Sequence, residues 1–90
     1  MNERRILIVD DNQENQIFLS LLLEKKGFRV TVADGGQQAL DLLEANGAEL
    51  VITDLMMPGM NGIELLSRIK ERHPGVDVII VTAYGSIPTA

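Results

Sequence analysis

The sequence has no cysteine and no tryptophan, and aromatic side chains make up only 3% of its 90 residues. Without cysteine, neither a disulfide framework nor a thiolate metal site can form, which fits a reducing compartment. Three prolines and eight glycines are too few for a collagen-like or low-complexity chain. Long apolar runs are missing too, since residues 76–83 contain Asp77 and fall far short of the roughly 18 residues that span a bilayer. These absences exclude disulfide-rich, fibrous and membrane-spanning classes.

An excess of basic residues is also missing. The chain carries 8 Lys and Arg against 13 Asp and Glu, and its only basic pairs are Arg4-Arg5 and Lys25-Lys26. The formal net charge of −5 disfavours direct binding to nucleic acid, because such binding relies on a concentrated positive surface. The first five residues open no secretory signal. We therefore expect a soluble, cytoplasmic protein.

What the sequence does contain is the composition of one small globular domain, with 46% apolar and 23% charged residues. Four β-branched runs predict strands at residues 6–9, 30–32, 50–52 and 78–81. The first, third and fourth runs are continuously apolar, which is typical of strands covered on both faces in a parallel sheet. The second run is more polar and suits an edge of that sheet.

Three segments between these strands have helical periodicity, at residues 13–26, 37–45 and 62–72. Each carries an apolar stripe, which is expected to face the core. The stripes consist of Ile17, Phe18, Leu21 and Leu22 in the first segment, Ala39, Leu40 and Leu43 in the second, and Ile63, Leu66 and Ile69 in the third.

Residues that favour helix ends stand at the predicted boundaries. Asp11 or Asn12 can cap the first helix, and Gly27 follows its last turn. Pro74 stops the third helix, and residues 86–90 have the pattern of a first turn of a further one. The resulting order, βαβαβαβ with a helix stub, predicts an open α/β parallel sheet. In such sheets ligands bind at the carboxyl ends of the strands.

Three of those carboxyl ends carry side chains with oxygen atoms. Asp10 and Asp11 follow the first strand, Asp54 follows the third and Thr82 follows the fourth. If these strands are neighbours, three carboxylates converge, which is costly unless a cation neutralises them. Oxygen ligands without Cys or His suit Mg²⁺. The sequence therefore predicts a magnesium site, although an acid after a strand can also serve only to cap the next helix.

Magnesium held by acids commonly serves phosphate chemistry, and a carboxylate beside it can act as a nucleophile toward a phosphoryl group. Thr82 can donate a hydrogen bond to a phosphoryl oxygen, and the small Ala83 leaves the approach to Asp54 open. The turn-rich loop 56–62 is expected to bring a backbone carbonyl near the metal. We interpret its three methionines as packing residues and His73 as a solvated residue at the end of a helix.

Three sequence segments, ILIVDDN, VITDLMMPGMNG and VIIVTAYGS, together resemble the receiver domain of two-component response regulators. They occur in the family's order and spacing, and the resemblance covers the whole chain. It implies a flavodoxin-like fold with strand order 2-1-3-4-5. It also implies phosphorylation of an aspartate by a histidine kinase or a phosphotransfer protein, so that the domain is a phosphoacceptor, at most self-phosphorylating from a small donor, and not an enzyme.

The resemblance also implies roles for individual residues. Asp54 would be the phosphoacceptor, Asp11 a direct Mg²⁺ ligand, and Asp10 would act chiefly through water or hydrogen bonds. The backbone carbonyl of Met56 would complete the protein ligands of the metal. Thr82 would be the hydroxyl that moves toward the phosphoryl group.

The sequence matches the family in the loop after the phosphoacceptor, which Pro58 and Gly62 would shape, and departs from it after the fourth strand. The family's fifth strand, with its Lys-Pro pair, has no counterpart here. Residues 1–90 are therefore expected to form a truncated receiver domain with strand order 2-1-3-4. An alternative function follows from this: the exposed edge at residues 78–81 could make the chain a self-associating module that does not switch.

Two further classes are less favoured by the sequence. A Mg²⁺-dependent phosphatase with an aspartyl nucleophile usually carries D-x-D on its first strand, whereas Asp10 and Asp11 are adjacent. A flavin-binding domain would need a Ser/Thr-rich phosphate loop after the first strand, which is lacking. Within the receiver family, residues 82–90 resemble the receivers of enhancer-binding transcription activators, and residues 10–15 resemble the receivers attached to hybrid histidine kinases. Both remain open.

Overall fold

The structure is a computed structural model that describes residues 4–82. All four predicted strands and all three predicted helices are present, with ends that differ from the predicted ones by no more than two residues. The elements are β1 (Arg5–Val9), α1 (Gln13–Lys25), β2 (Arg29–Ala33), α2 (Gly36–Asn46), β3 (Leu50–Asp54), α3 (Gly62–Arg72) and β4 (Asp77–Val81).

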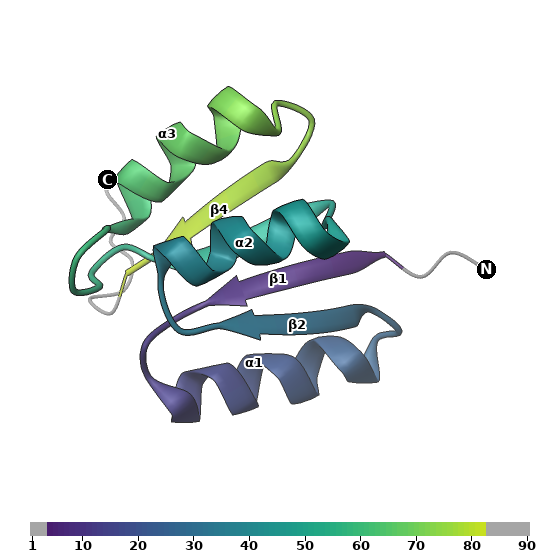
Figure 1. The fold of residues 1–90 in the computed structure, drawn as a ribbon. Coiled ribbons are helices and arrows are strands. Elements are labelled where there is room, and N and C mark those ends of the chain that lie inside the picture. Colours follow the sequence, from purple (N-terminus) through teal and green to yellow (C-terminus); the bar gives the residue numbers. More distant parts are fainter. Residues whose placement is uncertain (1–3, 83–90) are drawn as a thin grey trace, which may run out of the picture.

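The strands form one parallel sheet in the order β2-β1-β3-β4, which confirms the predicted flavodoxin-like α/β fold and the edge position of β2. The chain steps outward from β1 to β2 and then returns past β1 to β3. Right-handed crossovers therefore place α1 on one face of the sheet, and α2 and α3 on the other. Figure 1 shows α2 crossing in front of the strands and α1 lying along β2.

The main core lies between the sheet and the pair α2 and α3. Residues 6–9 of the central strand β1 are all buried, as their unbroken apolar run predicts. The two helices contribute side chains from their sheet-facing rows, and Met57 closes the core from the loop after β3. The core cluster consists of Leu7, Val9, Ala33, Ala39, Leu43, Val51, Met57, Leu65 and Ile69.

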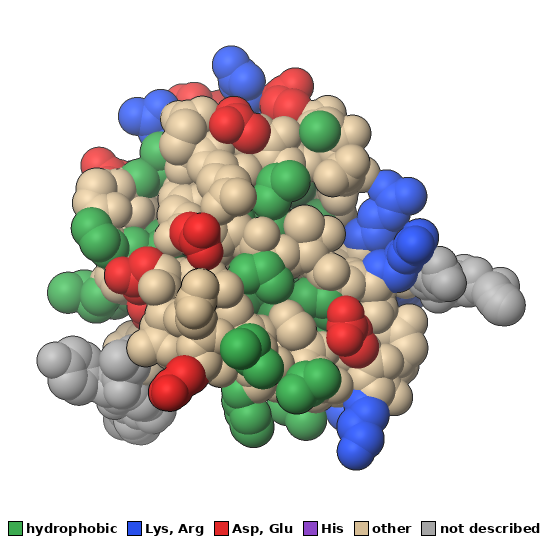
Figure 2. All heavy atoms as spheres, turned by 60° about the horizontal axis from the view of Figure 1, so that its bottom comes forward, with side chains coloured by type: hydrophobic (Ala, Val, Ile, Leu, Met, Phe, Trp, Pro, Cys, Tyr) green, Lys and Arg blue, Asp and Glu red, His purple; other side chains and the backbone are tan. Residues whose placement is uncertain are grey.

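The predicted core face of α1 is wrong. Only Gln16 is buried on this helix, with Leu19 and Leu23 half-buried in the same row. That row follows the i, i+3, i+7 spacing that faces the sheet, whereas the apolar stripe is turned away from it. In the view of Figure 2, which brings α1 forward, hydrophobic side chains stand at the surface. The stripe is 43 to 66% exposed and consists of Ile17, Phe18, Leu21 and Leu22.

Helix α3 begins and ends as predicted. Asn61 and Glu64 form a capping box, in which each side chain accepts a hydrogen bond from the other's backbone N–H at 2.9 and 3.0 Å. Its buried face is only partly as expected, because Ile63 is 59% exposed while Leu65 is fully buried with Ile69. The row 62, 65, 69 faces the sheet, and Ile63 lies one helical step away from it.

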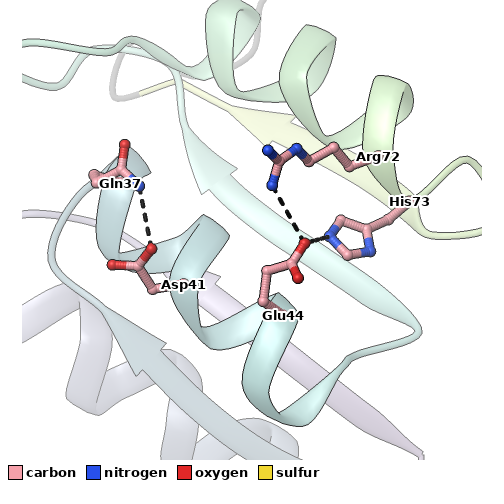
Figure 3. A network of polar contacts seen from close by, with 5 residues as sticks. All are labelled: Gln37, Asp41, Glu44, Arg72 and His73. Atoms are coloured by element: carbon pink, nitrogen blue, oxygen red, sulfur yellow. Dashed lines mark hydrogen bonds and ion pairs between the residues drawn. The ribbon is translucent and has the colours of Figure 1, made fainter.

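The interpretation of His73 as a solvated residue is also wrong. Its side chain is 22% exposed, and its Nε2 lies 3.4 Å from Oε2 of Glu44 at the end of α2. Arg72 approaches the same oxygen at 3.4 Å, so that both side chains from the end of α3 converge on Glu44 (Figure 3). These contacts join the last turns of α2 and α3, and the Arg72 pair is largely exposed, so its contribution to stability is small.

Strand β4 is covered on one face only within residues 4–82, contrary to the expectation from its unbroken apolar run. Its exposure alternates: Val78 and Ile80 are half-buried on the side of α3, whereas Ile79 and Val81 are 48% and 40% exposed. The helix on the other face, α1, makes its main contacts with β2 and β1.

Two sequence predictions lie outside the described residues: the helix stub at 86–90 and the placement of Ala83. In the described part of the chain, no helix combines the length and the hydropathy that crossing a membrane requires.

Candidate functional site

Three carboxylates meet at the carboxyl ends of the two central strands. Asp10 and Asp11 directly follow β1, and Asp54 is the last residue of β3. One carboxylate oxygen from each lies within 4.8 Å of the others. The register of β1 and β3 causes this convergence, because Val9 lies opposite Thr53 and both strands end at the same edge of the sheet. The convergence predicted from the sequence is therefore present.

Asp10 is buried and held by hydrogen bonds. The residue is only 6% exposed. Its two carboxylate oxygens accept hydrogen bonds from different donors. Oδ1 accepts from the backbone N–H of Asn12 at 2.9 Å, and Oδ2 from the side-chain amide of Asn15 at 3.3 Å. A carboxylate already paired with two donors is suited to a fixed negative charge beside a cation.

Asp54 has an environment that disfavours its charge. Partial burial raises its pKa above the ordinary value of 3.8, and the neighbouring charge of Asp10, with a smaller contribution from Asp11, raises it further. The backbone N–H groups of Met56 and Leu55 donate to it and act in the opposite direction. Repulsion among the three acids is therefore relieved either by a proton on Asp54 or by a cation.

The loop after β3 is anchored against Asp54 by a glycine. Gly62 donates its backbone N–H to the carbonyl of Leu55 at 2.9 Å. A Cβ at this position would lie 2.7 Å from the backbone oxygen of Asp54, closer than side chains come to backbone. The absence of a side chain thus lets the first turn of α3 pack directly on the backbone of Asp54.

The methionines of the loop do not behave alike. Met57 is buried in the core, and the side chain of Met60 packs where a Cβ on Gly36 would stand, so both fit the packing interpretation. The Met56 side chain is 62% exposed, which leaves its backbone as the part of the residue that faces the site. Pro58 is exposed in the same loop.

A hollow of about 240 Å³ lies beside the acids. Its lining joins the ends of β1, β3 and β4 to the start of α1, and Thr82 is part of it, as the sequence predicted. The residues that line it are Asp10, Asn15, Phe18, Leu19, Asp54, Val81 and Thr82. A larger hollow of about 530 Å³ lies at the opposite end of the sheet beside Arg5 and Arg29, away from the acid cluster.

The donor set fits a hard divalent cation. All three converging side chains are carboxylates, and the described residues that line the hollow include no Lys or Arg that could neutralise them. Mg²⁺ prefers such oxygen ligands and is commonly held by one or two carboxylates together with water and phosphate oxygens. The site is therefore chemically suited to hold such a cation.

A family profile for the response regulator receiver domain matches residues 6–90. The chain belongs to the response regulator receiver domain family. The match favours the receiver domain interpretation over the phosphatase and flavin-binding alternatives.

Two curated relatives illustrate how this receiver domain compares with longer proteins. It is 44% identical over 87 residues to sporulation initiation phosphotransferase F of Bacillus subtilis, covering 97% of this chain and 69% of that protein. It is 46% identical over 82 residues to the transcriptional regulatory protein CpxR of Escherichia coli, covering 91% of this chain and 34% of that one. The chain thus spans about a third of the transcriptional regulator.

Among solved structures, the receiver domain resembles the response regulator TrrA of Thermotoga maritima. A crystal structure of TrrA in complex with Mg²⁺-BeF aligns with a TM-score of 0.86 and 33% identity, over 91% of this chain and 71% of that one. A crystal structure of TrrA with the histidine kinase ThkA aligns with the same TM-score and 31% identity, over 97% and 75%.

The polar residues that hold the acids were not predicted from the sequence. Asn15 and Gln16, in the first turns of α1, both bond to Asp10, and Gln16 also reaches Asp34 after β2. One signal was available: Gln16 is a polar residue at a position that helical spacing shares with Leu19 and Leu23. A carboxamide in a buried row requires hydrogen-bond partners, and these lie at the site.

Proposed function

We propose that this receiver domain accepts a phosphoryl group on Asp54 in the presence of Mg²⁺. The observation that carries the proposal is the convergence of the carboxylates of Asp10, Asp11 and Asp54 within 4.8 Å at one edge of the sheet. Asp11, Asp54 and the backbone carbonyl of Met56 would hold the ion directly, and Asp10 would act through water or hydrogen bonds. The bound ion would supply positive charge that offsets the repulsion between these acids and a phosphate.

The proposed reaction transfers a phosphoryl group from a histidine nitrogen to a carboxylate oxygen. A carboxylate oxygen of Asp54 attacks the phosphorus of a phosphohistidine on a histidine kinase or phosphotransfer protein. The P–O bond forms, the P–N bond breaks, and its electron pair returns to the imidazole nitrogen. Thr82, which lines the same hollow, is proposed to donate a hydrogen bond from its hydroxyl to a phosphoryl oxygen. Support for a kinase partner comes from the relative TrrA, which crystallised with one.

Phosphorylation is tested with a small phosphodonor. The chain is incubated with acetyl phosphate and MgCl₂ and its intact mass is measured. We expect an added mass of one phosphoryl group that is stable in acid and lost in base. Asp54→Asn should abolish it, whereas Asp77→Asn, at the opposite end of β4, should not. An adduct that persists in Asp54→Asn would place the phosphoacceptor elsewhere.

Metal binding is tested separately from phosphorylation. Amide chemical shifts are followed by NMR while MgCl₂ is added without any phosphodonor. Asp54→Asn should weaken Mg²⁺ binding because it removes one ligand charge, and Asp77→Asn should leave it unchanged. An unchanged affinity in Asp54→Asn would mean that the metal site is misassigned. A cytoplasmic location and the absence of direct nucleic-acid binding stay predictions.

A further inference from the structure

Gln16 is the one buried residue of α1 in the described structure, at 9% exposure. Its side-chain nitrogen Nε2 lies 2.5 Å from the backbone oxygen of Asp10 and 2.8 Å from Oδ1 of Asp34. Both partners are acceptors, so the donor end of the carboxamide must face them, and both of its hydrogens are used. Gln16 thus joins the end of β1 to the residue that follows β2.

The contact with Asp10 controls more than the position of one atom. The carbonyl of Asp10 belongs to the planar peptide unit that leads into Asp11. A hydrogen bond to this oxygen therefore fixes the direction in which the chain leaves β1 and the place from which the Asp11 side chain starts. The carboxylate of Asp10 is held by other donors, Asn12 and Asn15, so Gln16 is the side chain that fixes its backbone oxygen.

The contact with Asp34 holds the carboxamide itself in place. A hydrogen bond to a carboxylate is stronger than one between neutral groups. Asp34 is anchored in turn, because its backbone N–H donates to Oε1 of Gln38 in the first turn of α2 at 2.7 Å. The peptide that carries Asp11 is therefore tied through Gln16 to the start of α2, an element that contributes no carboxylate to the cluster.

We propose that Gln16 is a positioning residue for the cation site: by bonding to the Asp10 carbonyl and to Asp34, it sets the direction of the peptide that places Asp11. This inference rests on the proposed function only in that the acid cluster binds Mg²⁺. In this proposal Gln16 contacts neither the ion nor the phosphoryl group and acts through the backbone between Asp10 and Asp11.

The decisive variant is Gln16→Glu, because geometry and charge predict opposite results. The substitution keeps the size of the side chain, removes both donor hydrogens and places an oxygen against two acceptors. Its added negative charge alone would tighten Mg²⁺ binding by Coulomb attraction. Loss of positioning weakens binding, by about tenfold if Gln16 behaves like other residues that orient metal ligands. Gln16→Met, which is neutral, should weaken binding as well.

Binding is measured by NMR titration of the full chain with MgCl₂ alone, since only folded protein contributes the dispersed amide signals. The matched control is Gln38→Met, which also removes a side-chain partner of Asp34 but does not touch Asp10. A purely structural role predicts that all three variants lose stability, that Gln16→Met and Gln38→Met keep the Mg²⁺ affinity, and that Gln16→Glu binds Mg²⁺ equally or more tightly. Positioning predicts that binding weakens in the two Gln16 variants and changes less in Gln38→Met, which leaves both hydrogen-bond donors of Gln16 in place.

A second readout separates positioning from chemistry. In the acetyl phosphate assay, the Mg²⁺ concentration for half-maximal phosphorylation should rise in Gln16→Glu, while the rate at saturating Mg²⁺ stays close to that of the unmodified chain. If the unmodified chain binds no Mg²⁺, the proposed function fails. If it binds and Gln16→Glu binds equally or more tightly, the positioning role of Gln16 is wrong.

Discussion

Asp54 and Gly62 show how two adjacent backbone segments specify the site at the scale of single residues. The acid is held close to like charges, and the glycine lets α3 approach its backbone. Asp54 was predicted for the site because it follows a strand, and Gly62 because of the resemblance to receiver domains. It could not predict how Asp10 is held, since the donors of Asn15 and Gln16 reach it only after α1 has folded back on β1.

The raised pKa of Asp54 predicts a dependence of stability on pH. Because the folded-state pKa lies above 3.8, the folded protein binds this proton more tightly than the unfolded chain. The free energy of unfolding therefore falls as the pH rises from about 3.8 through the folded-state pKa. Asp54→Asn cannot ionise, and without metal it should be more stable than the unmodified chain at pH 7 because it lacks the repulsion by Asp10 and Asp11.

Urea unfolding in chelator across a series of pH values measures this difference. The advantage of Asp54→Asn should shrink as the pH is lowered through 3.8, because below that pH the carboxyl group is neutral in both states. Asp77→Asn serves as the control. A mutant that is less stable than the unmodified chain in chelator at pH 7 would contradict the proposed repulsion.

Gly62→Ala should destabilise the fold through steric overlap. The new Cβ would stand 2.7 Å from the backbone oxygen of Asp54 and 3.0 Å from Cα of Leu55, so backbone must move. We expect a loss of about 1–3 kcal/mol in the free energy of unfolding. Gly75→Ala is the matched control, because nothing lies within 4 Å of its Cβ position. Equal stabilities in urea unfolding would show that the loop moves without cost.

At the scale of elements, the helix ends were more predictable than the helix faces. Caps are local: Asn61 and Glu64 act within one turn, and Gly27 takes its positive φ of 96° directly after α1. A buried face depends on which neighbour the helix meets. The apolar stripe of α1 misled the prediction because α1 contacts the sheet at β2 and β1 through the row of Gln16.

Substitutions on α1 and α3 test this assignment of faces. Leu21 is 61% exposed on α1, and Leu65 is fully buried on α3. Leu21→Ala should change the free energy of unfolding by no more than about 0.5 kcal/mol, as is usual for surface positions. Leu65→Ala should cost about 2–5 kcal/mol, because it leaves a cavity in the core. Comparable losses in urea unfolding would mean that the α1 stripe is covered in solution.

At the scale of the whole molecule, the parallel sheet explains why the site could be foreseen. The hand of the crossovers and the position of ligands at the carboxyl ends follow from general rules, and the strand order was implied by the resemblance to receiver domains. Together these led to the expectation that the acids meet. The exposure of one face of β4 was not predicted from its residue pattern. Its apolar run suggested cover on both faces, whereas within residues 4–82 it has one neighbouring strand and one covering helix.

Self-association through β4 remains a prediction that these exposures make specific. In the described structure, Ile79 and Val81 present apolar surface beside a strand edge without a hydrogen-bonded neighbour, which is the arrangement that favours pairing with another chain. Size-exclusion chromatography with light scattering should give the 90-residue chain a mass above that of one copy at micromolar concentrations. Ile79→Lys should restore the mass of a single copy, because a charge at a sheet edge opposes pairing. Ile63→Lys, at a similarly exposed position on α3, should leave the association unchanged. A monomer at every concentration would exclude the edge as an interface.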